Sequence, residues 1–185
     1  MTFRNSTERA AAGFSAVELL IVVAVFGILS AFAVPSLSGA LRDMQLAADA
    51  RNISSALGYA RIKAKSLSTP YQVAFDLGGN GWSVRRYNSG TDSFDLEQGV
   101  NGLSRGLSGS GITFKTSAAD PPAGFPDTSS SSITFNSRGI PVSGATPTAD
   151  NIVYLSRSGT DCAVTVTLTG KVQVWKKAGG GWCAL

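Results

Sequence analysis

The sequence predicts an α+β protein: a long N-terminal helical spine, transmembrane in its first half, packed on a C-terminal antiparallel β-sheet or β-sandwich domain. Three observations predict this fold class. Residues 14–34 are an apolar run with Glu18 as the only charge, residues 35–67 repeat apolar side chains at helical spacing, and residues 70–185 alternate short strand-like runs with Gly- and Pro-containing turns. We therefore expect a short basic leader at 1–13, a transmembrane helix at 14–34, its amphipathic continuation at 35–67 and a β domain at 70–185.

The apolar run has the length of a membrane helix. It contains 21 residues from Phe14 to Val34, which at about 1.5 Å per residue span roughly 30 Å, the hydrocarbon thickness of a bilayer. A short leader with Arg4 and Arg9 precedes it. An ionised Glu costs roughly 2.5–3.5 kcal/mol at the centre of a bilayer. Glu18 therefore requires a partner if it lies within the membrane.

Two other interpretations of this run remain open. Ala31-Phe32-Ala33 resembles the small-residue cleavage site of a secretory signal peptide, although the apolar region of such peptides is only about 7–15 residues long and this run is longer and contains Glu18. The run is also compatible with a plain membrane anchor whose Glu18 reaches toward the interface.

A second helical pattern, expected over residues 36–67, is one-sided. Its apolar positions follow spacings of 4, 3, 4 and 3 residues, as on one face of a helix. We assign the basic residues near its end to interaction with the helix dipole, with binding of an anionic partner as the alternative. Pro70 ends the pattern. The apolar positions are Ile53, Leu57, Ala60, Ala64 and Leu67, and the basic residues are Arg61, Lys63 and Lys65.

The rest of the chain reads as short strands joined by turns and loops. Residues 99–111 and 118–132 are rich in Gly, Ser or Pro and are expected to be loops. The spacing of the strands leaves no room for crossover helices, which favours antiparallel sheets. The expected strands are residues 71–76, 82–87, 94–98, 112–115, 132–136, 152–155, 163–168 and 171–175.

The composition argues against several kinds of function. The chain has no His, which removes the commonest general base and the commonest metal ligand, and we expect no cofactor, no metal and no enzymatic activity. The net charge of +4 is too small to indicate nucleic-acid binding by itself. A carboxylate-pair hydrolase using Asp92, Asp95 and Glu97 is the weakest hypothesis, because these residues lie in a polar segment where solvated charges are expected.

Cys162 and Cys183 are the two cysteines, and they flank the last predicted hairpin. Because a hairpin returns the chain near its start, we predict a disulfide between them. Closing a loop of about 20 residues contributes roughly 3 kcal/mol by restricting the unfolded chain. A disulfide is typical of an extracytoplasmic domain, whereas two cysteines at this spacing without His favour neither a metal site nor a redox motif.

The N-terminal residues resemble a known signal. Gly13 followed by Phe14, with Glu18 ahead of an apolar helix that reaches Pro35, is similar to the class III signal of type IV pilins and type II secretion pseudopilins. The resemblance implies that a prepilin peptidase cleaves between Gly13 and Phe14 and that Phe14 is N-methylated. It also implies that Glu18 neutralises the N-terminal amine of a neighbouring subunit, and that Pro35 kinks the helix.

Motifs in the second half narrow the resemblance to the GspH/FimT group of that family. They lie in residues 57–65, 71–76, 81–84, 133–139 and 169–172. The resemblance implies a structural minor pilin or pseudopilin near the tip of a filament, supporting protein secretion or pilus biogenesis. It also implies a single pass through the bacterial inner membrane with the β domain in the periplasm. The implied partners are other pilin subunits, the prepilin peptidase, the inner membrane and secreted cargo.

DNA uptake is the alternative function. Some members of the group bind DNA through a C-terminal Gly-Arg-x-Arg motif, whereas this chain has Gly170-Lys171-Val172-Gln173. Lys lacks the bidentate fork of Arg, and Gln has no charge. Lys171, Lys176 and Lys177 are the candidate DNA contacts, but solvated lysines at a hairpin end are the favoured interpretation. The sequence does not distinguish a secretion pseudopilus from a type IV pilus.

Overall fold

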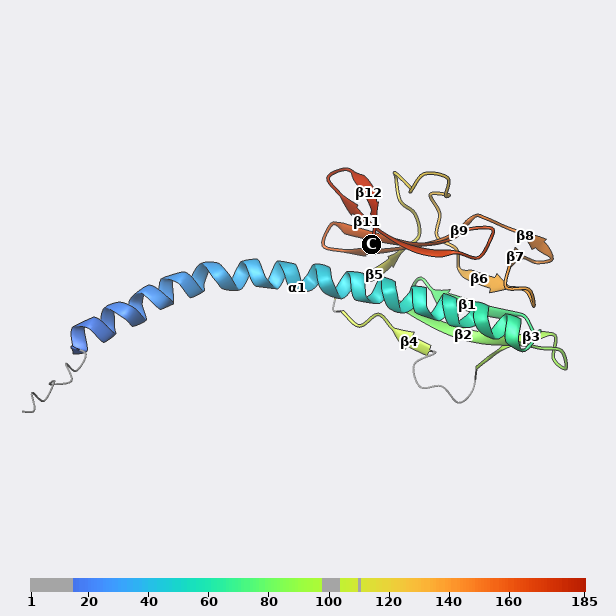
Figure 1. Ribbon diagram of the computed structural model, residues 1–185, viewed down its shortest axis with the longest axis horizontal. Helices are drawn as coiled ribbons and strands as arrows, with labels where there is room; N and C mark the ends of the chain where they lie inside the picture. Colours follow the sequence, from blue (N-terminus) through green and yellow to red (C-terminus); the bar gives the residue numbers. More distant parts are fainter. Residues whose placement is uncertain (1–14, 98–103, 110) are drawn as a thin grey trace, which may run out of the picture. The chain divides into compact units, whose positions relative to one another are not determined.

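The computed structural model describes residues 15–97, 104–109 and 111–185 (Figure 1). A 51-residue helix precedes a run of short antiparallel strands, and the predicted α+β class is confirmed. The elements are α1 (Ala16–Ser66), β1 (Tyr71–Asp76), β2 (Gly81–Asn88), β3 (Ser93–Leu96), β4 (Ser104–Gly106), β5 (Thr113–Lys115), β6 (Ser132–Phe135), β7 (Pro141–Ser143), β8 (Thr146–Pro147), β9 (Asn151–Arg157), β10 (Thr160–Val166), β11 (Val172–Ala178) and β12 (Gly181–Ala184).

Two compact units divide the chain within α1, between Ala40 and Leu41. The helix continues through Pro35, although proline has no N–H to donate to the preceding turn, and the kink expected there stays a prediction. Within the described residues, no helical stretch combines the length and the apolar character that a bilayer crossing requires.

In the unit Leu41–Leu185, the second half of α1 packs against two sheets (Figure 1). The first sheet has the order β3-β2-β1-β6-β7-β8, with β4 also paired to β2, and the second has the order β12-β11-β10-β9-β5. The apolar residues of the helix stripe pack against every second residue of the strands in both sheets. This follows because helix side chains share one face every three or four residues, whereas strand side chains share one face every two. The fully buried side chains of this core include Ile53, Leu57, Val73, Val84, Ile133, Phe135, Val153, Leu155 and Val164.

The predicted final hairpin forms from β10 and β11, with Val164 opposite Val174 and Val166 opposite Val172. We expected one buried face, but Ala163 and Thr165 on the other face are buried as well. Residues of the 118–132 loop pack on this face near Ala163, and the Trp175 indole covers Thr165 and donates to its hydroxyl at 2.9 Å.

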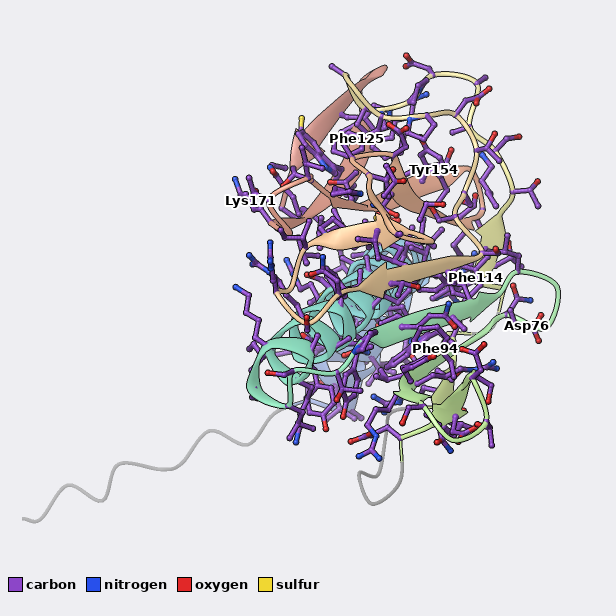
Figure 2. All side chains as sticks on the ribbon, turned by 90° about the vertical axis from the view of Figure 1, so that its right-hand side faces the viewer. Asp76, Phe94, Phe114, Phe125, Tyr154 and Lys171 are labelled. Carbon is purple, nitrogen blue, oxygen red and sulfur yellow. The ribbon has the colours of Figure 1, made fainter. Side chains whose placement is uncertain are left out.

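Phe125 of that loop packs beside Tyr154 (Figure 2). The Tyr154 hydroxyl donates to the Pro126 carbonyl at 2.7 Å, and the Trp182 indole donates to the Asp120 carbonyl at 2.7 Å. The segment predicted as a loop thus adds a small second core to the outer face of the sheet.

Four strands, β4, β7, β8 and β12, were not among the strands predicted from the sequence. β4, β7 and β8 have only two or three residues, too few to show an alternating pattern. β12 follows Gly179 and Gly180, both at positive φ (60° and 86°), which form a two-residue hairpin turn. This Gly-Gly pair is the sequence signal from which the last hairpin can be predicted.

Candidate functional site

The first half of α1 exposes apolar side chains on every side. Glu18, in its first turn, is also exposed. Gly13 and Phe14, the predicted cleavage and methylation positions, lie outside the described residues. The apolar side chains with exposed fractions between 45% and 69% are Val17, Leu19, Leu20, Ile21, Val22, Val23, Val25, Phe26, Ile28 and Leu29.

Arg61 joins the end of α1 to both sheets. Its Nε donates to the Gly139 carbonyl at 3.1 Å, in the turn between β6 and β7. Its Nη2 donates to the Thr169 carbonyl at 2.7 Å, in the turn between β10 and β11. The sequence analysis assigns Arg61 to the helix dipole and does not predict this contact with two distant turns.

Two glycines make this junction possible. Gly139 and Gly170 have φ of 71° and 78°, a region that favours glycine. A Cβ on Gly139 would lie 2.4 Å from the Lys65 Cε, and a Cβ on Gly170 would lie 2.6 Å from the Arg61 Nε. Three motifs that are far apart in the sequence therefore meet here, and we call Arg61, Gly139 and Gly170 the Arg61 junction.

The three candidate DNA-contact lysines do not form one surface. Lys176 pairs with Asp43 of α1 at 2.9 Å, and Lys177 pairs with Asp120 at 3.3 Å. Successive residues of a strand point to opposite faces, so these two lysines lie on opposite sides of β11. Lys171 is exposed beside the Arg61 junction, away from Tyr154 (Figure 2).

The predicted disulfide is absent, because Cys162 and Cys183 are both free thiols. Cys162 lies opposite Lys176 of β11, and Lys176 lies opposite Cys183 of β12. Two strand spacings separate the cysteines, about 10 Å, whereas a disulfide needs Cα atoms about 4.4–6.8 Å apart. The prediction overlooked β12, which places a whole strand between them. Burial raises the pKa of the Cys162 thiol to about 11, so this thiol stays protonated at neutral pH.

The three carboxylates of the hydrolase hypothesis have separate partners. Asp92 accepts from the Tyr87 hydroxyl at 2.5 Å, Asp95 from the Asn88 amide at 2.7 Å, and Glu97 from the Tyr71 hydroxyl at 3.1 Å. Asp95 and Glu97 line a shallow hollow of about 350 Å³ that does not include Asp92. Each carboxylate thus accepts a hydrogen bond from a different side chain, and the three do not line one common pocket as a catalytic acid and base would.

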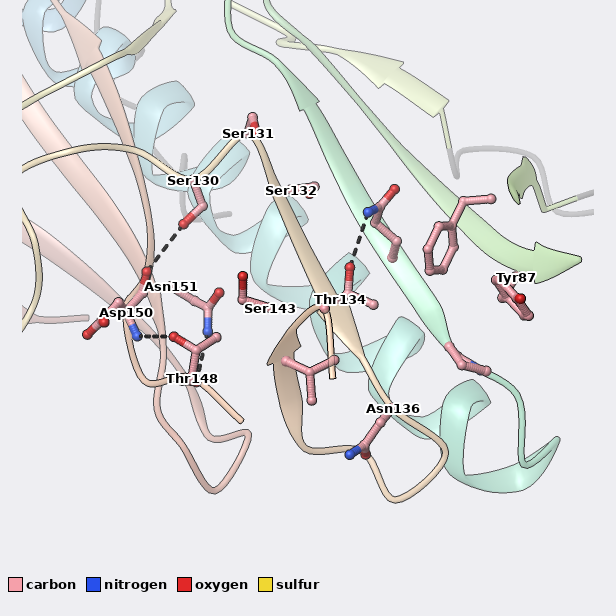
Figure 3. A pocket seen from close by; sticks show the side chains of 15 residues that line it. Tyr87, Ser130, Ser131, Ser132, Thr134, Asn136, Ser143, Thr148, Asp150 and Asn151 are labelled. Atoms are coloured by element: carbon pink, nitrogen blue, oxygen red, sulfur yellow. Dashed lines mark hydrogen bonds between the residues drawn. The ribbon is translucent and has the colours of Figure 1, made fainter. Parts of the chain in front are cut away.

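A wider groove, of about 770 Å³, lies over β1, β6 and β7 (Figure 3). Its floor carries Gln72, whose amide donates to the Thr134 hydroxyl at 3.1 Å, and its wall carries Thr148, whose hydroxyl accepts from the Asp150 amide at 3.2 Å. Hydroxyls and amides dominate the lining, and Asp150 is its single charged residue. These groups can bind water or neutral polar ligands, and Asp150 is the only carboxylate among them.

The fold and sequence have known relatives. The family model described as "Type II transport protein GspH" matches residues 49–170, which is more than half of the chain. The chain belongs to the GspH family. The match starts after the predicted leader and apolar helix and ends before β11, so it covers neither the N-terminal signal nor the last two strands. No curated protein sequence gives a significant match.

Solved structures with the same fold come from both kinds of filament. The minor pseudopilin EpsH of the Vibrio cholerae type II secretion system superposes with a TM-score of 0.52 at 12% identity, covering 70% of this chain and 95% of EpsH. The type IV minor pilin FimU of Pseudomonas aeruginosa superposes with a TM-score of 0.52 at 17% identity, covering 76% of this chain and 94% of FimU. The GspH-family fold of this chain is therefore shared between secretion and pilus proteins.

Proposed function

We propose that this chain is a structural minor subunit of a type II secretion pseudopilus or a type IV pilus. Before assembly, the first half of α1 spans the bacterial inner membrane once, with the β domain in the periplasm. A prepilin peptidase removes residues 1–13 and methylates Phe14. The subunit then enters the filament near its tip, where the β domain contacts other subunits or cargo and performs no catalysis.

The exposed apolar surface of residues 17–29 is the observation that carries this proposal. Ten large apolar side chains, at least 45% exposed each, surround the helix on all sides. Exposing a continuous apolar surface of this size to water is unfavourable. Such a surface indicates a contact with lipid or with other proteins. Membership of the GspH family and the two filament-protein relatives of the same fold support the same function.

Glu18 selects the assembly partner in this mechanism. A carboxylate and an amine are each costly in an apolar environment, and pairing them removes most of that cost. Removal of the leader creates a new amine at Phe14, four residues before Glu18. The amine of one subunit and the Glu18 of its neighbour then neutralise each other as the helices pack.

Two measurements test the proposal. Mass spectrometry of the protein from its native cells should give a mature chain that starts at N-methylated Phe14. Glu18→Gln should abolish incorporation into the filament while the protein still reaches the membrane, whereas Glu97→Gln, a carboxylate of the β domain, should assemble normally. A different mature N-terminus, or normal assembly of E18Q, contradicts the proposal.

DNA capture is a second candidate, and the cations around the Arg61 junction favour it. Lys65, Arg138 and Lys171 are exposed there, and none forms an ion pair with a described residue. Exposed cations from three chain segments suit a phosphate backbone. Since Lys176 and Lys177 are already paired with carboxylates, this patch replaces them as the expected contact.

A gel-shift titration with duplex DNA tests this second function. Binding should weaken steeply with salt and should fall at least fivefold in a Lys65→Gln, Arg138→Gln, Lys171→Gln triple variant. Lys176→Gln serves as the matched control and should bind as the wild type does. Binding that is absent, or insensitive to salt, rules out DNA capture.

A further inference from the structure

The groove over β1, β6 and β7 combines two kinds of surface. The aromatic rings of Tyr87 and Phe94, directly opposed residues of β2 and β3, line one part of it. Figure 3 shows Tyr87 on one side and Thr148, Asp150 and Asn151 on the other. The groove volume of about 770 Å³ lies within the range of about 300–1,000 Å³ found for small-molecule sites. A ligand of ordinary size can therefore contact both surfaces.

The aromatic pair is held in place by contacts of its own. The Tyr87 and Phe94 rings meet edge to face, with centroids 5.6 Å apart and an angle of 64° between their planes. The Tyr87 hydroxyl donates to the carboxylate of Asp92 at 2.5 Å, and Asp92 does not line the groove. Both rings are partly exposed. They can therefore contact an apolar ring of a ligand without losing much side-chain entropy.

Asn136 supplies a donor whose orientation is fixed. Its Oδ1 accepts from the backbone N–H groups of Arg138 and Ile140, both at 3.0 Å. Because a backbone N–H can only donate, this turn requires the amide oxygen on its side. The amide N–H groups of Asn136 donate to no described residue, and Asn136 lines the groove. A ligand oxygen can accept from them.

The other polar side chains supply acceptors and a further donor. The Gln72 amide donates to the Thr134 hydroxyl at 3.1 Å, which leaves the Gln72 Oε1 as an acceptor and the Thr134 hydroxyl as a donor. The Asn151 amide donates to the Thr148 carbonyl at 3.1 Å, which leaves the Asn151 Oδ1 as an acceptor. The Asp150 carboxylate forms no hydrogen bond or ion pair with a described residue.

This set of groups matches a neutral sugar chain. Each sugar hydroxyl both donates and accepts, as the mixed lining requires, and a carboxylate such as Asp150 forms stronger hydrogen bonds with hydroxyls than a neutral acceptor does. The C–H face of a sugar ring is apolar and suits an aromatic ring. Asp150 disfavours an anionic ligand, and the described residues that line the groove include neither Lys nor Arg to bind one.

We propose that this groove binds a neutral oligosaccharide. One sugar ring packs on the Tyr87–Phe94 pair, and hydroxyls of the chain donate to Asp150 and to the Gln72 Oε1 and accept from the Asn136 amide. All of these residues belong to the unit Leu41–Leu185. The site therefore does not depend on the proposed filament function.

The test uses the full-length protein in micelles of a detergent that has no sugar headgroup, and isothermal titration calorimetry. The neutral probes are cellohexaose, maltohexaose and chitohexaose, and the acidic probe is hexagalacturonate. At least one neutral probe should bind, and hexagalacturonate should bind at least tenfold more weakly or not at all. Failure of all three neutral probes, or preferred binding of the acidic one, overturns the proposal.

Asn136→Asp separates ligand binding from the structure of the turn. The new carboxylate still accepts from both backbone N–H groups, so the thermal unfolding midpoint should match that of the wild type. The variant loses the amide donor and adds a second negative charge to the groove, so it should weaken binding of the neutral probe at least tenfold.

Phe94→Ala tests the aromatic pair and should weaken binding at least fivefold. Leu96→Ala is its matched control, because Leu96 lies on the same strand, is 54% exposed and does not line the groove. L96A should bind as the wild type does. Unchanged affinity in both N136D and F94A, or equal losses in F94A and L96A, contradicts a sugar site in this groove.

Discussion

The two halves of α1 differ both in the pattern of their apolar residues and in what surrounds them. From Val17 to Leu29 the large apolar side chains are all at least 45% exposed, whereas Leu46, Ile53 and Leu57 in the second half are at most 1% exposed. The second half carries its apolar residues on one stripe, and two sheets of the same chain cover that stripe. The first half is apolar on every side. The comparison shows that the sheets of the same chain can bury an apolar stripe on one side of a helix, whereas a helix that is apolar on every side leaves most of its apolar surface for other partners.

This difference assigns separate roles to the two halves. The stability of the globular unit depends on the second half, whose buried side chains form its core with the sheets. Substitutions in the two halves should therefore have separable consequences, and the following predictions test that separation.

The largest expected effect is loss of core packing at Leu57. This side chain is fully buried between α1 and the sheets. Leu57→Ala should lower the free energy of unfolding of the globular unit by about 2–5 kcal/mol, because a cavity replaces the lost methyl groups. Chemical unfolding of the full chain in detergent, followed by Trp fluorescence, measures this change.

Leu20→Ala is the matched control in the first half, where the side chain is 69% exposed. It should change the same free energy by less than about 0.5 kcal/mol. Equal losses in L57A and L20A would contradict the division of roles, because they would mean that the globular unit depends on the first half as well.

A smaller effect is expected at the Arg61 junction. Arg61→Met keeps the aliphatic stem but removes the donors to the carbonyls of Gly139 and Thr169. It should cost about 1–3 kcal/mol, since these carbonyls lose their charge-assisted hydrogen bonds. Lys63→Met, on the same turn of the helix, is the control and should be near neutral. A stability of R61M equal to that of K63M would show that the junction does not hold the turns.

The helix and the alternating strands could be predicted because each depends on local periodicity. The stripe through Ile53, Leu57, Ala60 and Ala64 and the alternation of Val164 and Val166 are visible in the sequence, and the structure buries all six residues. Leu67, the last predicted position of the stripe, was wrong, because α1 ends at Ser66 and Leu67 is 47% exposed. The Arg61 junction could not be predicted in this way, because it joins residues separated by 78 and 108 positions.

The cysteine prediction failed for a related reason. It assumed that the chain ends next to the strand that begins near Cys162, but β12 is a further strand and sits one place beyond β11. Four residues after a Gly-Gly turn gave too short a pattern to be recognised as a strand by alternation alone. Pairing order within a sheet is a tertiary property, and a disulfide prediction depends on it.

The last expected effect appears only at alkaline pH and is confined to the globular unit. Burial, with the hydrogen bond to Glu97, raises the pKa of Tyr71 to about 12, and burial raises the pKa of Tyr154 to about 12. The ordinary value for Tyr is 10.0, so both groups bind their protons more tightly in the folded state. Their contribution to stability is therefore complete below pH 10 and is lost as the pH rises from 10 toward 12. The first half of α1 contains no Tyr, which makes this loss specific to the globular unit.

Unfolding titrations between pH 9 and about 11.5 should show a steeper decline of the free energy of unfolding for the wild type than for a Tyr71→Phe, Tyr154→Phe double variant. Equal slopes would mean that other groups, such as the lysines, cause the alkaline loss of stability.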